Sequence, residues 1–150
     1  MRIITNIFGG VLMYVSYPAV FYFDKEGRGY NITFPDFTGA TMGENEADGM
    51  KMASDFLGCK LYDFVVENKE FPKPTNILDV KMEDDGYSDL SKSFVTMVGL
   101  DLNQYMKDTE TKVVRKNVTI PKYLNEMGKN FNINFSKLLT EALEREFEID

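Results

Sequence analysis

The sequence predicts an α+β protein built from two unequal units. In the first hundred residues, short runs rich in Tyr, Phe and Val precede one long helical pattern. Residues 112–121 then form another strand-like run, which ends in a proline and is followed by two short helical patterns. The length of 150 residues suits one ordinary domain or two small ones. We therefore predict a β-β-β-α-β unit over residues 1–110 and a β-α-α unit over residues 111–150.

The first unit is expected to open with a β-hairpin and a third strand. The run 14–23 has strand composition, and its Pro18 suits a sheet edge or a bulge. Residues 24–27 (Asp-Lys-Glu-Gly) indicate a turn, and 29–34 predicts the second strand. Residues 38–42 predict a short third strand.

A long helix is expected to follow and to lie against the sheet. Asn45 is a favourable N-cap, and Asp48 three residues later makes a pair similar to a capping box. Apolar residues then recur at helical spacing on the face predicted to meet the sheet: Ala47, Met50, Ala53, Leu57, Leu61 and Phe64. Gly49 and Gly58 weaken the helix intrinsically, so contact with the sheet is expected to sustain it.

The remainder of the first unit is predicted to contain a long loop and a returning strand. Residues 71–74 (Phe-Pro-Lys-Pro) end the helix. The polar, acidic stretch 75–91 predicts a loop with one extended piece at 77–80. The β-branched, apolar run 94–100 predicts the fourth strand, and the polar residues 101–111 predict a linker.

The second unit begins with a strand that has one apolar and one polar face. The apolar face holds Val114, Val118 and Ile120, and the polar face holds Arg115, Asn117 and Thr119. Pro121 suits the first position of a helix, because its missing N–H would have no partner there. Leu124 and Met127 mark this helix, and Gly128 lies near its end.

A second helix is predicted to start after Asn134, a favourable N-cap. Its broad apolar stripe consists of Phe135, Leu138, Leu139, Ala142, Leu143 and Phe147. One strand and two short helices bury too little apolar surface to be stable alone. We therefore expect two copies to pair their strands into a ribbon, which fits the DNA major groove. This is the ribbon-helix-helix arrangement, and it predicts a DNA-binding homodimer.

Candidate DNA-binding residues follow from this arrangement. Arg115, Asn117 and Thr119 would read base edges, since Arg binds guanine and Asn binds adenine in the major groove. Four lysines would attract phosphates without sequence preference: Lys112, Lys116, Lys122 and Lys137. The second helix start, with Asn134 and Ser136, would hold a phosphate. Alternatively, the polar strand face is only solvated, and Asn134 and Ser136 only cap the helix.

The charge distribution suggests two different partners. Residues 1–110 hold ten basic and eighteen acidic residues, a net charge of −8, whereas residues 112–137 hold six basic and one acidic, a net charge of +5. The acidic unit would attract a basic protein, and the basic segment would contact phosphates. Solubility alone is the other explanation of the acidic charge.

The composition excludes several classes of function. The chain has no histidine, which excludes histidine-dependent triads and zinc hydrolases. Its single cysteine, Cys59, can form neither an intramolecular disulfide nor a cysteine-rich zinc site. No apolar run is long enough to span a membrane, and residues 1–14 lack a signal-peptide pattern. We expect a cytoplasmic protein with no cofactor, no metal and no membrane partner.

Five motifs resemble HicB-type antitoxins. They are residues 17–24 (YPAVFYFD), 34–39 (FPDFTG), 43–45 (GEN), 117–124 (NVTIPKYL) and 134–136 (NFS). The last two resemble the ribbon-helix-helix module of one branch of that family. The resemblance covers roughly residues 13–147, and the order of the motifs is more specific than any one of them.

The resemblance implies a truncated ribonuclease-H-like fold for the first unit. It also implies that this unit neutralises HicA, a small basic toxin that cleaves messenger RNA, and that the second unit represses the operon. Candidate toxin-binding residues are Asp36, Phe37, Glu44 and Glu46, which the sequence groups around the third strand and the helix start. A core position is the alternative for Phe37. Assembly beyond the dimer, through the N-terminal units, stays open.

Two other functions compete with this one. Asp24, Asp36 and Glu44 could gather two Mg²⁺ ions for phosphodiester cleavage, but carboxylates at strand ends commonly serve turns. We therefore do not expect an enzyme. The rival from another class is a ribbon-helix-helix transcriptional regulator whose N-terminal unit senses a small ligand.

Overall fold

A computed structural model describes residues 14–110 and 112–147. The N-terminal stretch, for which we expect no signal peptide, lies outside these residues. The strands are β1 (Tyr14–Asp24), β2 (Tyr30–Thr33), β3 (Ala40–Gly43) and β4 (Ser88–Asp101). The helices are α2 (Glu46–Val66), the 3₁₀ turn η1 (Ile77–Asp79), α3 (Leu102–Thr109), α4 (Lys122–Asn130) and α5 (Phe135–Glu146). None of the helices within this described part is long and apolar enough to cross a membrane.

The four strands form one antiparallel sheet in the order β3-β2-β1-β4. The predicted hairpin of β1 and β2 is confirmed, with Phe21 opposite Ile32 and Phe23 opposite Tyr30. The predicted third strand is confirmed as β3, which pairs with β2. β1 pairs with β4 over most of its length, with one irregularity between Phe21 and Phe23.

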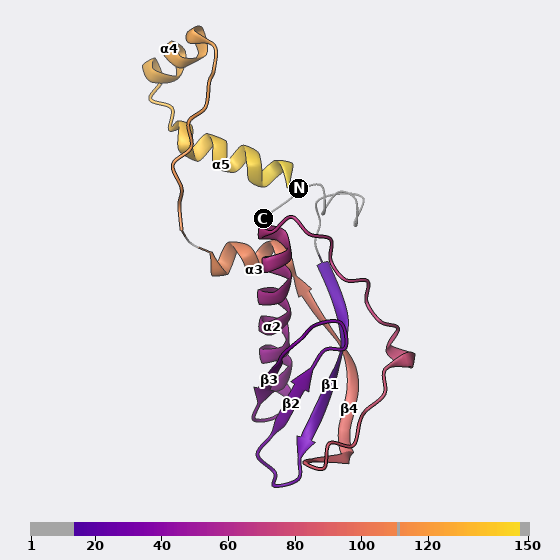
Figure 1. Ribbon diagram of the computed structural model, residues 1–150. Coiled ribbons are helices and arrows are strands. Elements are labelled where there is room, and N and C mark those ends of the chain that lie inside the picture. Colours follow the sequence, from indigo (N-terminus) through magenta and orange to yellow (C-terminus); the bar gives the residue numbers. More distant parts are fainter. Residues whose placement is uncertain (1–13, 111, 148–150) are drawn as a thin grey trace.

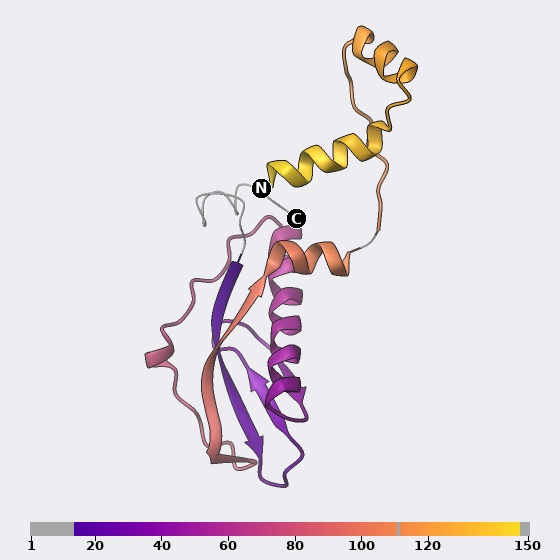
Figure 2. The same cartoon turned by 180° about the vertical axis from the view of Figure 1, so that it is seen from behind.

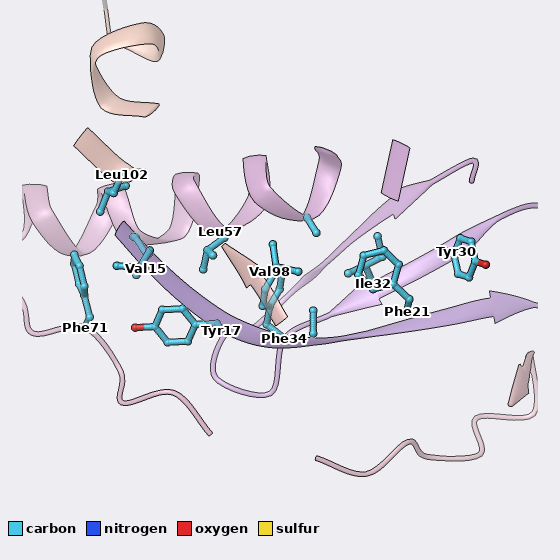
Figure 3. Close-up of a cluster of buried hydrophobic side chains, with 13 residues drawn as sticks. Val15, Tyr17, Phe21, Tyr30, Ile32, Phe34, Leu57, Phe71, Val98 and Leu102 are labelled. Atoms are coloured by element: carbon cyan, nitrogen blue, oxygen red, sulfur yellow. The ribbon is translucent and has the colours of Figure 1, made fainter. Parts of the chain in front are cut away.

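The sheet lies between two layers (Figure 1). Helix α2 covers one face, and the long segment 67–87 runs along the other side of the sheet; Figure 2 shows the same order from behind. The helix-facing side of β1 carries Val15, Tyr17, Ala19 and Phe21, all of which are buried. They pack with Ile32, Phe34, Leu57, Val98 and Leu102 in the core shown in Figure 3.

Helix α2 starts as predicted but meets the sheet through different residues. Asn45 Oδ1 accepts the N–H of Asp48 at 2.9 Å, and Asp48 Oδ2 accepts the N–H of Glu44 at 2.8 Å, which is a reciprocal cap. Ala53, Leu57 and Leu61 are fully buried, as expected.

The prediction was wrong for Ala47 and Met50, which are exposed. Gly49, which lies between them in the sequence, is buried instead. It packs so closely on the sheet that an added Cβ would come within 2.9 Å of the Phe21 ring. Gly58 is buried for the same reason, since Tyr105 of α3 packs where its Cβ would be. The glycines thus bring α2 close to its neighbours and are more than weak points in the helix.

Three predictions after α2 need correction. Residues 77–79 are not extended, and of the predicted piece only Val80 is. Asn76 Oδ1 accepts the N–H of Leu78 at 2.9 Å and starts the 3₁₀ turn η1. The fourth strand is longer than 94–100, because its polar start at Ser88 and Asp89 pairs with the end of β1. The polarity of these residues suggested a loop, although a strand with one solvated side is equally polar.

The predicted linker 101–111 is largely a helix, α3. Asp101 Oδ1 accepts the N–H of Gln104 at 3.1 Å and caps it, and Leu102 is fully buried in the core. The helix has only eight residues, so its few apolar positions gave a weak periodic signal.

The two C-terminal helices are present, but the strand before them is not assigned. Pro121, which we predicted at the first helical position, is instead the N-cap of α4, and the helix begins at Lys122. Asn134 caps α5 as predicted, and its Oδ1 accepts the N–H of Lys137 at 3.0 Å. Residues 112–121 form no strand in this single chain. A strand needs a hydrogen-bonded neighbour, and none of the described strands lies beside this segment.

Candidate functional site

The segment 112–147 exposes nearly all of its large apolar side chains. Val113 is 93% and Val114 is 85% exposed on the segment before α4. The exposed apolar residues after Val114 are Val118, Ile120, Tyr123, Leu124, Met127, Phe131, Ile133, Phe135, Leu138, Leu139 and Leu143. A soluble domain rarely leaves so many such residues uncovered together, and such patches mark interaction sites.

Two hollows collect these apolar side chains. The first has a volume of about 400 Å³ and lies among α4, the 131–133 connection and the start of α5. The second has a volume of about 470 Å³ and is lined by Lys116, Val118 and Ile120 together with α5 residues that include Phe135 and Leu139. The predicted apolar stripe of α5 therefore faces the segment 116–120 but is not covered by it.

The predicted DNA-binding side chains are exposed on this unit. Arg115, Asn117 and Thr119 alternate in sequence with residues that line the second hollow. Lys116 lines that hollow with Val118 and Ile120, whereas Arg115 and Asn117 do not. Lys112 and Lys122 are exposed near the two ends of the segment.

The start of α5 combines a helix cap with two exposed polar side chains. Asn134 is held by its bond to the Lys137 backbone N–H, and the backbone carbonyl of Ser136 accepts a hydrogen bond from Thr140 Oγ1 at 2.9 Å. The Lys137 ammonium lies 3.9 Å from Glu141 Oε1, a pair on the exposed face of the helix. Capping by Asn134 is therefore confirmed.

The four candidate toxin-binding residues fall into two groups at opposite ends of β3. Asp36 and Phe37 lie in the connection before the strand, and Glu44 and Glu46 follow it. Asp36 accepts hydrogen bonds from the Thr75 N–H at 3.0 Å and from Thr75 Oγ1 at 2.7 Å. Phe37 packs edge-on against Tyr17, with the ring centroids 4.9 Å apart. The first pair therefore has contacts within the fold.

Glu44 and Glu46 are exposed at the N-terminal end of α2. Glu46 Oε1 accepts a hydrogen bond from the Tyr30 hydroxyl at 2.8 Å. The pKa of Glu46 is lowered by a hydrogen bond from its own backbone N–H and then by the Tyr30 hydroxyl. Glu46 is therefore held as a carboxylate, in a position where the positive end of the helix dipole also favours the charge.

The carboxylates considered for Mg²⁺ binding do not gather. Asp24 bonds to the Arg28 guanidinium, which lowers the pKa of Asp24, and Asp36 is bonded to Thr75. Across residues 14–110 and 112–147, no three Asp, Glu or Cys side chains are placed to hold a metal ion together.

One feature of the N-terminal unit was missed in the sequence. A hollow of about 410 Å³ lies at the hairpin end of the sheet and includes Tyr22, Met42 and Tyr87. These residues come from three distant segments, and Tyr87 belongs to the stretch that we predicted as a loop. Only the strand register brings them together, so no local pattern pointed to the hollow.

Comparison with known proteins gives the chain a family. Residues 17–144 match the model of the HicB-like antitoxin of bacterial toxin–antitoxin systems. No curated protein shows a significant match. A solved chain of a toxin–antitoxin complex from Streptococcus pneumoniae is 33% identical; the match covers 89% of this chain and 99% of that chain, with a TM-score of 0.59. The antitoxin HicB of Burkholderia pseudomallei is 20% identical, with 86% and 96% covered and a TM-score of 0.48. Because the family model spans most of the sequence, this chain belongs to the HicB-like antitoxins of bacterial toxin–antitoxin systems.

Proposed function

We propose that this antitoxin masks an mRNA-cleaving toxin with its N-terminal unit and represses its own operon through a C-terminal ribbon-helix-helix dimer. The proposed C-terminal dimer rests on one observation, the uncovered apolar surface of residues 112–147. A second copy of the same segment is the partner that fits this surface, because both copies would bury the same residues. The proposed antitoxin acts by binding, so we assign it no catalytic residue.

The dimer would complete what the single chain lacks. Residues 112–121 form no strand alone, and antiparallel pairing with a second copy would satisfy their backbone groups. The same pairing would cover the hollows around Ile120 and Leu138. Burial contributes roughly 25 cal/mol per Å² of apolar surface, so covering so many Leu, Ile, Val and Phe side chains is a large favourable term.

The ribbon would present Arg115, Asn117 and Thr119 to the DNA major groove. Lys112, Lys122 and Lys137 would contact phosphates, and the start of α5 with Asn134 and Ser136 would hold another phosphate at its free N–H groups. The net charge of +5 over residues 112–137 supports this assignment. Lys116 has a weaker claim, because it lines the apolar hollow beside Val118.

The N-terminal unit would bind the toxin. Its net charge of −8 favours a basic partner, and the related Streptococcus pneumoniae chain comes from a toxin–antitoxin complex. Of the four candidate residues, Glu44 and Glu46 are exposed carboxylates, whereas Asp36 and Phe37 are engaged within the fold. We therefore place the toxin contact at the end of the sheet where α2 begins.

The first test is to express the gene with its native neighbours and purify the tagged chain. We expect a small basic protein to co-purify, to be toxic when produced alone and to be harmless in the complex. A chain that purifies without a partner but still binds its own promoter would instead support the ligand-sensing regulator.

The DNA-binding half is tested by binding to the chain's own promoter and to unrelated DNA. Asn117→Ala should weaken promoter binding by about 1–3 kcal/mol and leave binding to unrelated DNA nearly unchanged. Lys112→Ala is the matched control, because a lost phosphate contact should weaken both and reduce the salt slope by about one. An equal loss on both DNAs for Asn117→Ala would contradict base readout.

A further inference from the structure

The hollow at the hairpin end of the sheet has a floor made by one row of paired residues. Tyr22 of β1 lies opposite Asn31 of β2, and Asn31 lies opposite Met42 of β3. All three line the hollow, whose volume is about 410 Å³. Phe23 and Tyr30, one position along, pack into the core, so by strand alternation this row lies on the face opposite α2.

One wall of the hollow is made by Asp85, Tyr87 and Ser88, at the end of the 67–87 segment and the start of β4. The Tyr22 hydroxyl accepts the N–H of Glu83 at 3.0 Å. Asp85 accepts the N–H groups of Tyr87 and Ser88, both at 2.8 Å. The N–H of Lys25 in the hairpin turn donates to the Tyr87 carbonyl at 3.0 Å. These bonds fix the wall before any partner arrives, which lowers the entropic cost of binding.

Two large side chains in the hollow are exposed. Met42 is 68% exposed and Tyr87 is 79% exposed, although both lie next to residues of the folded sheet. Neither has a ring contact or a side-chain hydrogen bond among those found in the described residues, so their exposed surface is available to a partner. Tyr and Met are enriched in the buried centres of protein interfaces.

The charges around the hollow select a cationic occupant. Asp24 and Asp85 line it, and their carboxylate pKa values are lowered, chiefly by a hydrogen bond from Arg28 and by one from the Tyr87 N–H, respectively. The exposed acidic residues within two positions of the lining residues are Glu26, Glu44, Glu83 and Asp84. They outnumber Lys25, whose ammonium donates to the Gly86 carbonyl at 3.1 Å. Arg28 is already bonded to Asp24 and lies 3.2 Å from Glu26, so it adds little free positive charge.

We propose that this hollow is the anchoring pocket for a lysine or arginine side chain of the toxin. The inference rests on the proposed function and specifies which surface of the N-terminal unit the toxin contacts. The aliphatic stem or guanidinium plane would pack on Tyr87 and Met42, and the cationic head would face Glu83, Asp84 and Glu44. The packing contact sets the dissociation rate, and the carboxylates set the association rate.

The test measures binding of these variants to the small protein encoded beside this gene, purified from the complex. Tyr87→Ala should weaken binding at least about tenfold, mainly through faster dissociation, as expected for an aromatic anchor. Leu78→Ala is the matched control: Leu78 is 88% exposed on the same segment, does not line the hollow and should bind within about twofold of the unaltered chain.

Charge is tested separately with Asp84→Lys, which should slow association and reduce its salt dependence. Glu70→Lys makes the same change in charge next to Phe71, at the far end of the sheet, and should have a smaller effect. Unchanged circular dichroism and urea midpoints would show that the variants fold. Tight binding by Tyr87→Ala would overturn the inference and leave the proposed function standing. No binding by the unaltered chain would overturn both.

Discussion

At the residue scale, Asp36 shows how a position in a motif that resembles the family can serve the fold. It lies in the connection between β2 and β3 and bonds to Thr75, thirty-nine residues later in the chain. The Tyr17 hydroxyl makes a second tie nearby, donating to the Pro72 carbonyl at 2.6 Å. Together these bonds attach the start of the 67–87 segment to the sheet, and they make a structural role for Asp36 testable.

Asp36→Ala should lower the free energy of unfolding by about 1–3 kcal/mol, because the half-buried Thr75 N–H and hydroxyl lose their acceptor. Urea denaturation measures this loss, and limited proteolysis should cut faster within residues 72–82. Asp36→Asn keeps one acceptor oxygen and should lose less. If both variants are as stable as the unaltered chain but fail to bind toxin, Asp36 is a contact residue instead.

Tyr17 predicts how stability responds to alkaline pH. Burial, and then the nearby Asp36 carboxylate, raise the pKa of Tyr17 to about 12. The unfolded chain releases this proton near the ordinary tyrosine pKa of about 10, while the folded chain still holds it. The stabilising contribution is therefore present below pH 10 and is lost as the pH rises toward 12.

Tyr17→Phe should flatten the fall in stability between pH 10 and 12, as measured by urea midpoints across that range. Tyr22→Phe is the control, because it removes a tyrosine hydroxyl from the same strand but outside the core cluster. A steep alkaline fall that survives in Tyr17→Phe would assign the effect to Tyr30 and Tyr105, whose pKa values burial also raises.

At the element scale, the approach of α2 to β3 depends on two glycines. A Cβ added to Gly43 would lie 2.3 Å from the Gly49 Cα. Because that Cα is a backbone atom, it cannot rotate away as a flexible side chain would. The helix start is therefore set by the absence of two side chains. The sequence shows both glycines but does not show that they face one another, because that depends on the sheet register.

Gly43→Ala should destabilise the chain by about 1–3 kcal/mol through overpacking against Gly49. Gly27→Ala is a useful comparison, because its φ of +74° is strained for alanine while nothing lies within 4 Å of the added Cβ. It should cost about 1–2 kcal/mol from strain alone. Thermal unfolding compares the two, and a smaller loss for Gly43→Ala would mean that α2 shifts easily.

The predictable elements were those with a local signal. Asn45 and Asn134 allowed their helices to be predicted, because a helix cap depends only on its own side chain and the N–H groups of the next turn. The length of β4 and the helix α3 were missed because their residues are polar: the start of β4 is fixed by its partner β1, and Leu102 is buried by elements distant in sequence. The hollow at Tyr87 could not be predicted either, because its lining comes from segments that only the folded sheet brings together.

At the scale of the whole molecule, the charge split of the sequence coincides with two surfaces of different character. The acidic N-terminal unit has a compact core and a preformed hollow, whereas the basic segment 112–147 leaves its apolar side chains uncovered. Among the contacts that join the end of the chain to α3, Asn103 Nδ2 donates to the Phe147 carbonyl at 3.5 Å, and Lys107 lies 3.8 Å from Glu144. The proposed pairing with a second copy would supply the burial that these uncovered side chains lack.

If the second unit folds only as a dimer, its helices α4 and α5 should melt at a temperature that depends on protein concentration. In a dimer that has no stable folded monomer, raising the concentration raises the apparent Tm. Leu138→Asp should abolish this dependence, because Leu138 lines both apolar hollows, and the variant should sediment as a monomer or as dimers formed only through the first unit.

Tyr123→Asp is the matched control: Tyr123 is 64% exposed, lines neither hollow and lies in the first turn of α4, where a carboxylate is tolerated. A Tm that is independent of concentration in the unaltered chain, with residues 112–121, α4 and α5 all protected from proteolysis, would mean that the first unit covers this surface and that the ribbon does not form.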